Sequence, residues 1–505
     1  MAETSSTILA KDTRSGEKRY TDQAQLTGKF LIRGILKTES PLMIGCGKSD
    51  LSGIDILLDK KEHRPFIPGS SLAGVVRHAL LDFCNQEDVS RLFGLSYEET
   101  QSVTDKTQMS QIYFGDAYVT GDYTVRVRDS VRINSRTAAA SDQGKFDYEV
   151  IESGAEFPIG IEVSIRKSIE SSFVIGMCRL IFSLFDSQHI RIGAKTNAGF
   201  GRFNLKKFSY MYLDFKKPQD VKTWLTRSYD NDFHAGWLTT FPDSGKQEDK
   251  SIREKGNDSF LFQGIFSISN SLMVRSYDQL EGYENCDAVM MTAGSDETAI
   301  IPGPSLRGAF RHHAEKIFNT FHPGHKKQFE QMFGIVETDF DSNTTVEKTR
   351  KIKSKIRVEE QRVENQLSKL LTRNRINRFT GGTLETALFS IAPLWGGGSG
   401  AIHLEISAKC LDRWEAGLLV LTIKDFWFGV AAVGGNQSIG SGFLSGQTGK
   451  LRYNGKTINL KEKDKELQLT SEDDSFDPEE FLDLLIETFH LGCAGSFLTE
   501  PPTEI

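Results

Sequence analysis

The stretch FIPGSSLAGVVRH, residues 66–78, decides the fold because it returns as IIPGPSLRGAFRH at residues 300–312. The two copies lie 234 positions apart, so Gly69 recurs as Gly303 and Leu72 recurs as Leu306. Ile-Pro-Gly followed by apolar residues at helical spacing is typical of a turn that opens a helix. The chain therefore contains the same strand–turn–helix passage twice.

Further blocks recur in the same order on both sides of this motif. Residues 31–45 (LIRGILKTESPLMIG) match 261–275 (LFQGIFSISNSLMVR), and residues 53–55 match 285–287. Downstream, Arg132-Ile133-Asn134 matches Arg375-Ile376-Asn377, and the Gly-x-Gly at 199–201 matches 440–442. Such collinear matches predict a duplicated domain. We expect a first domain at 28–215, a polar linker at 216–258, a second domain at 259–453 and a C-terminal extension at 454–505.

Each copy predicts the same order of elements. An alternating apolar stretch reads as a strand, the Pro-Gly turn opens a helix, and later segments (156–166 and 401–408) again read as strands. A second helix, the Gly-x-Gly loop and a last strand complete each copy. We therefore predict an α+β fold of two tandem ferredoxin-like domains, the layout of RNA-recognition motifs, in which RNA lies across the sheet.

Bulk composition agrees with a multidomain protein. The chain has 505 residues and a formal net charge of −7, which argues mildly against a pure polyanion binder. The six cysteines form no C-x-x-C pair, and the N-terminal segment lacks the apolar core of a signal peptide. We expect a cytoplasmic protein with no membrane-spanning helix and no structural zinc site.

The glycine motifs have two readings. Residues 69–74 have the spacing of a phosphate-binding P-loop, but Val75-Val76 replaces its Lys-Ser/Thr, which disfavours nucleotide hydrolysis. What remains is a helix N-terminus that either holds a phosphate or serves only as a tight turn with an N-cap. The Gly-x-Gly loops likewise allow close approach of a phosphate or of a packed neighbour.

Clusters of basic residues follow each helix. Eleven Lys or Arg and three Glu lie between residues 348 and 378, and Arg126, Arg128, Arg132 and Arg136 cluster in the first copy. Local clusters of this kind supply phosphate contacts in an otherwise acidic protein. A charged surface helix over 348–370 is the alternative.

Asp55 and Asp287 lie in loops upstream of the two Pro-Gly turns. A carboxylate beside bound RNA could hold a divalent cation or assist deprotonation of a 2′-hydroxyl. An aspartate in such a loop is also a common turn former.

The combination of Gly-Ile-Asp, Ile-Pro-Gly-Ser-Ser-Leu, Leu-Phe-Gly, Arg-Ile-x-x-x-Thr and a terminal Gly-x-Gly resembles the RAMP superfamily. In particular, it resembles the backbone subunits of type III CRISPR effector complexes, and the duplication resembles the double-backbone subunit of subtype III-D. The resemblance implies that each domain carries an inserted thumb hairpin, around 126–148 and 351–389. It also implies that the domains hold a CRISPR RNA, that this guide pairs with single-stranded target RNA, and that the partners are other subunits of the complex.

The resemblance also implies a cleavage site. Asp55 stands at the family's Gly-Ile-Asp position, and Asp287 stands in the altered Asn-Cys-Asp of copy two. These two aspartates are the candidate catalytic and metal-binding residues, with magnesium or manganese as cofactor. The candidate RNA-binding residues are Gly69, Ser70, Ser71, Arg77, Arg132, Arg136, Gly199, Gly201, Gly303, Ser305, Arg307, Arg311, Arg375, Arg378, Gly440 and Gly442. The alternatives are a non-catalytic guide-RNA scaffold and an endonuclease that processes CRISPR RNA.

Overall fold

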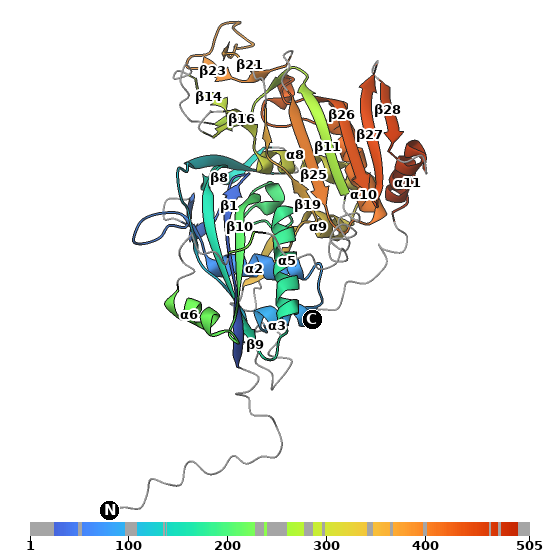
Figure 1. The fold of residues 1–505 in the computed structure, drawn as a ribbon. Coiled ribbons are helices and arrows are strands. Elements are labelled where there is room, and N and C mark those ends of the chain that lie inside the picture. Colours follow the sequence, from blue (N-terminus) through green and yellow to red (C-terminus); the bar gives the residue numbers. More distant parts are fainter. Residues whose placement is uncertain are drawn as a thin grey trace, which may run out of the picture.

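The fold was analysed in a computed structural model of the chain (Figure 1). The structure describes residues 25–48, 53–95, 109–134, 137, 139–227, 237–239, 260–276, 286–294, 298–340, 347–363, 367–396, 401–463, 466–472 and 476–492. They form two α+β domains, each with its own sheet and its own apolar core.

The first domain is built on an antiparallel sheet in the order β10-β1-β9-β5. Its strands are β1 (Leu26–Thr38), β5 (Ile112–Phe114), β9 (Glu156–Arg166) and β10 (Phe203–Asp214). Helices α2 (Gly69–Leu80) and α5 (Ser171–Asp186) connect β1 to β5 and β9 to β10. The spatial order fourth, first, third, second is the ferredoxin-like arrangement expected from the sequence.

Alternation along β1 creates the first core. Phe30, Ile32 and Leu36 point to the same side and are almost fully buried among α2 and α5. Leu72, Val76 and Leu80 supply the buried stripe of α2, as the helical spacing predicted. The helix ends at Leu80, and Phe83 packs against the core from the following turn.

The second domain repeats this order and extends it. Its sheet runs β19-β25-β11-β26-β27-β28, and every neighbouring pair is antiparallel. The core strands and helices are β11 (Phe260–Ile268), β19 (Ile356–Val358), β25 (Ile402–Ala408), β26 (Leu444–Tyr453), α8 (Gly303–Phe321) and α10 (Arg413–Trp427). Leu306, Phe310 and Ala314 form the buried stripe of α8.

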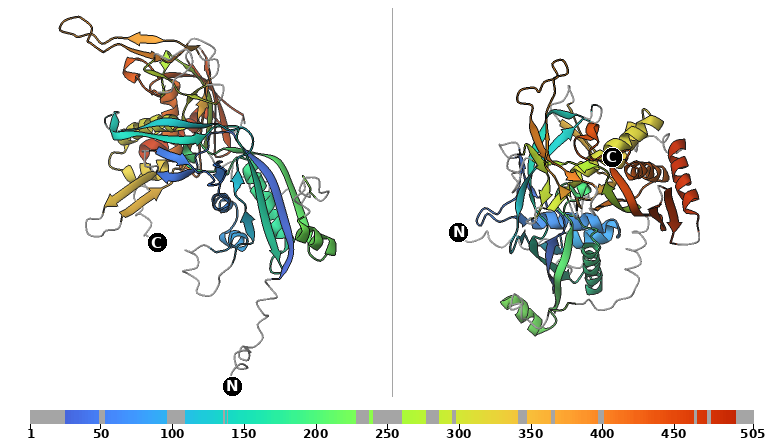
Figure 2. Two further views of the ribbon diagram at one scale, coloured as in Figure 1. Left: turned by 90° about the vertical axis from the view of Figure 1, so that its left-hand side faces the viewer. Right: turned by 90° about the horizontal axis from the view of Figure 1, so that it is seen from above.

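The C-terminal extension belongs to the second sheet. It provides β27 (Lys456–Lys463), β28 (Glu466–Ser471) and α11 (Pro478–Leu491), at the margin remote from the first domain (Figures 1 and 2). Asp477 caps α11 by accepting a hydrogen bond from the backbone N–H of Glu479. The backbone of Leu485 in α11 lies so close to Gly417 of α10 that a methyl group on this glycine would clash. The extension therefore completes the second domain by adding two strands and a covering helix.

The remaining elements lie outside the two core sheets. In the first half they are β2 (Gly45–Lys48), β3 (Gly53–Ile56), β4 (Phe66–Ile67), α3 (Gln86–Phe93), β6 (Ala117–Tyr118), β7 (Val125–Ile133), β8 (Ala140–Ile151), η1 (Thr196–Ala198) and α6 (Pro218–Thr226). In the second half they are β12 (Ser271–Leu272), β13 (Arg275–Ser276), β14 (Ala288–Met290), β15 (Thr292–Ala293), β16 (Thr298–Ile301), α9 (Lys326–Phe333), β17 (Ile335–Phe340), β18 (Glu347–Ile352), β20 (Gln361–Arg362), β21 (Leu367–Ser368), β22 (Leu371–Arg373), β23 (Phe389–Ala392), β24 (Leu394–Trp395) and η3 (Gln437–Ile439).

The basic stretch at 348–370 is not a surface helix. It continues β18, passes through the core strand β19, and then forms β20 and β21. The second insertion predicted at 351–389 was therefore too long, because it contains the second strand of the ferredoxin-like core. The hairpin in this region is formed by β22 and β23, whereas the first domain carries the longer hairpin β7–β8.

The predicted linker contributes one helix to the first domain. Helix α6 brings Trp224 against Leu31, Met211 and Leu213, on the side of the sheet opposite α2 and α5. Trp237 joins the same cluster. Part of the outer sheet face of the first domain is therefore covered by the chain itself.

Candidate nucleic-acid interface

The surroundings of Asp55 are set by the small sheet β2-β3-β8-β7. Ile54 pairs in parallel with Tyr148, and this pair is the last one between β3 and β8. Asp55 therefore lies where the two strands diverge. Its side chain is partly buried, and no hydrogen bond or ion pair to its carboxylate joins it to the described residues.

The second domain repeats this sheet, and its pairing fixes which residues correspond. In the first domain Gly45 pairs with Ile56; in the second, Arg275 pairs with Met290. Val289 precedes Met290 as Asp55 precedes Ile56, and Val289 is 2% exposed. Val289 therefore holds the place of Asp55, and the second copy has an apolar side chain at this position.

Asp287 occupies a different place. Ala288 pairs with Ile391 as Ile54 pairs with Tyr148, so Asp287 corresponds to Gly53. Matching residues 53–55 to 285–287 was thus wrong by two residues. The backbone N–H of Ser390 donates to Oδ2 of Asp287 at 2.7 Å. The side chain is exposed, but its carboxylate is engaged with the neighbouring strand.

A second carboxylate beside Asp55 was missed in the sequence. Oε2 of Glu149 accepts a hydrogen bond of 3.0 Å from the backbone N–H of Ile56, at the point where the ladder between β3 and β8 ends. Asp55 and Glu149 are the residues that follow the last pair on each strand. The corresponding residues of the second domain, Val289 and Ala392, pair with each other. The period-two pattern along β8 could have suggested Glu149 as a site residue, but not its hydrogen bond with Ile56.

The described residues around Asp55 do not form a complete metal site, but they provide carboxylates that a divalent cation can bind. Among the described residues, no group of three or more His, Cys, Asp or Glu side chains lies together as a metal site. Magnesium, however, is commonly held by one or two carboxylates together with substrate phosphates. Asp55 and Glu149 supply such a donor set on adjacent strands.

The two helix N-termini are already capped by carboxylates. The backbone N–H of Gly69 donates to Oδ1 of Asp116 at 2.7 Å, and that of Gly303 is hydrogen-bonded to the carboxylate of Glu360. Neither glycine has room for a side chain, since an added Cβ would lie 2.1 Å from Phe114 O or 1.7 Å from Ala198 O, respectively. These carboxylates occupy the position that a phosphate would take. The exposed Ser70 and Ser71, and the partly buried Ser305, lie on the adjoining helical turns.

The glycine loops have close neighbours within the chain. Gly201 and Gly442 have left-handed backbones, with φ of 75° and 89°, and lie against the carbonyls of Ile192 and Val433. Gly199, with φ of 85°, faces the backbone N of Glu360, 2.6 Å from its would-be Cβ. Of the two interpretations of this loop, the close approach of a packed neighbour is therefore the one that applies to Gly199. Gly440 has the same φ of 85°, yet its nearest neighbour is a side-chain nitrogen at 3.5 Å.

The helix arginines bind the end of a neighbouring helix. Arg307 donates to Phe333 O at 2.7 Å, and Arg311 donates to Gly334 O at 2.7 Å. These carbonyls terminate α9, where cations are favoured by the helix dipole. Burial lowers the pKa of Arg307 to about 10, and the charge of Arg311 contributes. Arg77 is their partly buried counterpart on α2.

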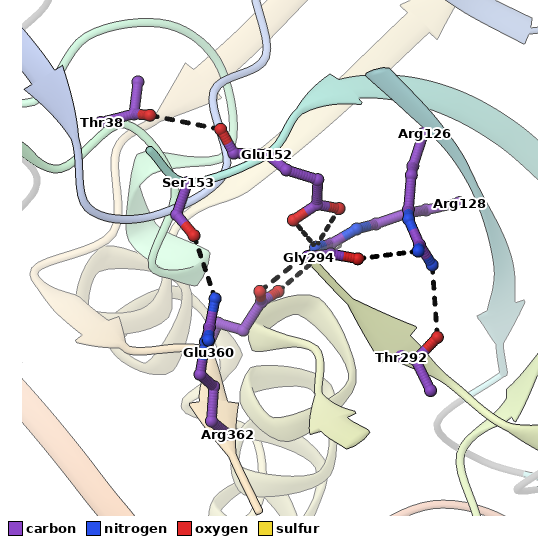
Figure 3. A network of polar contacts seen from close by, with 9 residues as sticks. All are labelled: Thr38, Arg126, Arg128, Glu152, Ser153, Thr292, Gly294, Glu360 and Arg362. Atoms are coloured by element: carbon purple, nitrogen blue, oxygen red, sulfur yellow. Dashed lines mark hydrogen bonds and ion pairs between the residues drawn. The ribbon is translucent and has the colours of Figure 1, made fainter. Parts of the chain in front are cut away.

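Two arginines of the first basic cluster hold the domains together (Figure 3). Arg128, 3% exposed, forms ion pairs with Glu152 at 2.9 Å and with Glu360 of the second domain at 2.5 Å. Burial alone would lower the pKa of Arg128, but the two carboxylates outweigh it and raise the pKa above its usual value. Arg126 donates to Gly294 O at 2.8 Å. These side chains are therefore not free for phosphate.

Other arginines remain exposed on the hairpins. Arg132 lies near the end of β7, and Arg375 and Arg378 lie in the turn between β22 and β23. Arg136 lies outside the described residues. Apolar side chains accompany them, among them Phe379 at 94% exposure on the second hairpin and Ile133 at 56% on the first. Exposed arginines beside apolar and aromatic side chains can contact phosphates and bases together.

Lys195 lies at the base of the first hairpin. Its Nζ is 3.2 Å from the ring centroid of Tyr148 and 5.1 Å from that of Phe146. Burial, with help from the charge of Arg128, lowers the pKa of Lys195 to about 8. Phe146 and Tyr148 are thus engaged with a lysine of their own domain.

The outer faces of the two sheets differ in what they offer RNA. In the first domain α6 covers the part of the face around Leu31 and Met211, and Tyr113 of β5 is 66% exposed. The second face forms the floor of a cavity of about 560 Å³ bounded by Arg202 of the first domain, and the exposed His403 is the one aromatic ring among the residues around it. That RNA lies across the sheet stays a prediction.

Among the described residues, none of the helices has the length and apolar character required to span a bilayer.

The pattern of the RAMP superfamily matches residues 35–204 and 287–445, more than half of the chain. The chain belongs to the RAMP superfamily. One RAMP region falls in each ferredoxin-like domain, the first from within β1 to the start of β10 and the second from after β11 to the start of β26. The duplication inferred from the sequence is therefore a duplication of this family's domain.

Similarity to individual proteins is weaker. No curated protein matches the sequence at a significant level. One similar solved chain comes from the cryo-EM structure of the type III-B Cmr-beta complex bound to cognate target RNA, with 17% identity and a TM-score of 0.29. The match covers 36% of the present chain and 61% of the solved one.

Proposed function

We propose that this RAMP protein is a CRISPR RNA-binding backbone subunit of a type III effector complex that cleaves target RNA paired with the guide. The observation that carries the proposal is the Asp55 carboxylate, left without a protein partner among the described residues, in the first of two RAMP domains. Family membership and the quoted motifs support guide binding. The cleavage step rests on Asp55 and its surroundings.

The two hairpins, β7–β8 and β22–β23, are the proposed RNA contacts. Arg132, Arg375 and Arg378 are exposed on them and would bind backbone phosphates without reading sequence. Base pairing with the guide would then supply specificity, as in other guide-directed systems. Phe379 and Ile133 are exposed on these hairpins and would help to displace a base pair of the guide–target duplex, which is the role that the resemblance implies for a thumb.

The proposed reaction uses the target's own 2′-hydroxyl. The 2′-oxygen bonds to the adjacent phosphorus, and the bond from that phosphorus to the 5′-oxygen of the next nucleotide breaks. The 2′-hydroxyl loses its proton to a base and the 5′-oxygen gains one, which leaves a 2′,3′-cyclic phosphate and a 5′-hydroxyl. Asp55 would either accept the first proton or bind a divalent cation.

Glu149 would position Asp55. Its bond to the N–H of Ile56 fixes the backbone immediately after the aspartate. When bound by Asp55 and Glu149, magnesium or manganese would supply positive charge against the phosphate in the transition state. The second domain lacks both carboxylates at these positions, which disfavours a second cleavage centre at Asp287.

A non-catalytic scaffold is the second candidate function. The observation that favours it is the second domain itself, which keeps the fold and the exposed Arg375 and Arg378 but has Val289 and Ala392 in place of the carboxylates. One domain of this chain would then already act as a scaffold, and both would do so if Asp55 is not catalytic.

The test is target cleavage by the assembled complex, with wild type compared to a chain carrying both Asp55→Ala and Asp287→Ala. Guide RNA bound to the purified complex is measured in parallel. Loss of at least one cut with the guide still bound supports the nuclease. An unchanged pattern of cuts with guide binding intact would support the non-catalytic scaffold. A wild-type complex that binds no guide RNA would rule out both functions.

A further inference from the structure

The two domains meet in a joint of polar side chains. Arg128 of the first domain binds Glu360 of the second at 2.5 Å, and Arg191 binds Glu359 at 2.7 Å. These four side chains are at most 9% exposed. The other polar contacts of the joint are Arg126 with Gly294 and Lys409 with His189. Two arginine–carboxylate pairs of similar length and burial therefore hold the domains together.

The two pairs attach to different parts of the first domain. Arg128 lies on β7, in the sheet β2-β3-β8-β7 that carries Asp55. Figure 3 shows it reaching from this strand to Glu360, beside Arg126 of the same strand. Arg191 lies between α5 and η1, outside that sheet. Glu360 therefore holds the sheet of the Asp55 region directly, and Glu359 holds only the loop beside it.

A short series of strand pairs leads from Glu360 to Asp55. Arg128 on β7 pairs with Tyr148 on β8, and Tyr148 pairs with Ile54 on β3. Asp55 is the next residue of β3. Two strand pairings, with no loop between them, thus separate the arginine that Glu360 binds from the backbone of Asp55.

Close packing makes this connection stiff. The ring of Phe200 lies 5.7 Å from the guanidinium carbon of Arg128, and its centroid lies 6.2 Å from that of Tyr148. Nζ of Lys195 lies 3.2 Å from the ring centroid of Tyr148. Phe200 and Tyr148 are 0% and 2% exposed. Because packed interiors have few voids and transmit strain, a displacement of Arg128 would be passed on to β8.

The second domain offers an internal comparison. Leu371 holds the place of Arg128 in the strand register there, and the two carboxylates of the Asp55 region are absent. The buried arginine and the carboxylates thus occur together in one copy and are absent together from the other. A leucine suffices for this strand to form, so folding of the hairpin alone does not require the arginine.

We propose that Glu360 of the second domain is a positioning residue for cleavage at Asp55, and that it acts through Arg128 by fixing β7 and β8 beside β3. The inference rests on the proposed function, in which Asp55 takes part in cleavage. Side chains alternate between the faces of a sheet, so Arg128 and Tyr148 lie on the face opposite Asp55. Glu360 therefore does not touch the reacting groups.

The contribution of Glu360 is geometric. Proton transfer to Asp55, or a metal bond from it, requires the carboxylate within hydrogen-bonding or coordination distance of its partner. Small displacements of a catalytic group by a remote substitution can cost a large factor in rate. The second domain thereby serves the cleavage centre of the first domain, although it lacks the carboxylates of such a centre itself.

The test compares Glu360→Gln with Glu359→Gln in the assembled complex with guide RNA. Each substitution removes one buried carboxylate charge from the joint and keeps the shape of the side chain, so the two are matched. The cut that depends on Asp55 is followed in single turnovers over a range of target-RNA concentrations. We expect Glu360→Gln to lower its maximal rate about tenfold. Glu359→Gln should keep the wild-type rate, and both variants should keep the wild-type affinities for guide and target.

Two further measurements accompany the cleavage assay. Arg128→Lys attacks the same pair from the first domain, since lysine keeps the charge but loses the planar fork of the arginine. It should lower the maximal rate as Glu360→Gln does. Hydrogen exchange of the backbone amides of residues 53–56, recorded without target RNA, reports the position of the strand itself. We expect exchange to be faster than in the wild type for Glu360→Gln and Arg128→Lys, and unchanged for Glu359→Gln.

Equal maximal rates for Glu360→Gln and Glu359→Gln, or wild-type exchange at residues 53–56 in Glu360→Gln, would overturn the positioning role. A loss confined to target affinity would also overturn it, because the pair would then belong to RNA binding. Asp55→Ala is measured alongside. If it leaves every cut in place, the proposed function fails and the positioning role fails with it. If it removes a cut that Glu360→Gln leaves at full rate, only the positioning role fails.

Discussion

The two domains share one backbone plan but use equivalent positions for different purposes. At the base of β7, Arg128 is buried between two carboxylates and joins the domains; its counterpart Leu371 is apolar. Beside β3, Asp55 and Glu149 stand where the second domain has Val289 and Ala392. The comparison teaches that the duplication retained its strand register, while the buried arginine and the two carboxylates occur in only one copy. Substituting corresponding residues in the two domains should therefore change stability or activity by different amounts.

The largest stability effect is expected from Arg128→Ala. It leaves Glu152 and Glu360 buried without their cation, and breaking a buried ion pair in this way costs about 3–5 kcal/mol. Urea unfolding of the purified chain measures the loss. The control is Arg132→Ala on the same strand, where the exposed side chain should change stability by less than about 0.5 kcal/mol. Equal small losses in both variants would contradict the role of Arg128 in the joint.

A smaller difference is expected between Gly199→Ala and Gly440→Ala. Both glycines have a φ of 85°, so the backbone strain of an alanine is common to the two variants. Only at Gly199 would the new Cβ meet backbone atoms of the second domain, with Glu360 N at 2.6 Å. We expect Gly199→Ala to lose about 1–3 kcal/mol more in urea unfolding. Equal losses of unfolding free energy in the two variants would show that the contact between the domains accommodates the new Cβ without a free-energy cost.

Acidification should weaken the joint at His189. Burial, together with the charge of Lys409, lowers its pKa from the usual 6.5 to about 4. The unfolded chain therefore takes up the proton first, and stability is lost as the pH falls from about 6.5 towards 4. We expect His189→Gln to reduce this pH dependence by the order of 2 kcal/mol in unfolding curves recorded across that window. The exposed His403, changed to Gln, is the control; an unaltered slope in the His189 variant would refute the assignment.

The smallest effects concern the exposed arginines of the second hairpin. Arg375→Ala and Arg378→Ala should each weaken binding of guide RNA by a few fold, independently of its sequence. Each should also reduce the salt dependence of binding by about 0.7 in log–log slope, as for the loss of one phosphate contact. Filter binding at several salt concentrations measures both quantities. Unfolding curves should not change, and a stability loss would place these side chains in the fold instead.

Much of the fold could be predicted because the repeat is long and its apolar periodicity is clear. The Ile-Pro-Gly helices and the strands at 156–166 and 402–408 lie where the pattern placed them. Strand β19 was hidden in a basic run, since three residues are too few for a periodic signal. The joint could not be foreseen, because the sequence does not reveal that Arg128 meets a carboxylate 232 positions away.

The site was harder to predict for a similar reason. Gly53-Ile54-Asp55 was matched to residues 285–287 on a single shared aspartate, while the insertion that shifts the register lies in the loop before it. Strand pairing resolves the register because Arg275 opposes Met290. Glu149 also escaped notice, since its contact with Ile56 spans 93 positions.

The most direct test compares target-RNA cut maps of the assembled complex for wild type, Asp55→Ala and Asp287→Ala, with bound guide measured in each sample. We expect Asp55→Ala to abolish one cut while the others persist, and Asp287→Ala to reproduce the wild-type map. Loss of a distinct cut in Asp287→Ala, or an unchanged map in Asp55→Ala with guide bound, would contradict the assignment of cleavage to the first domain alone.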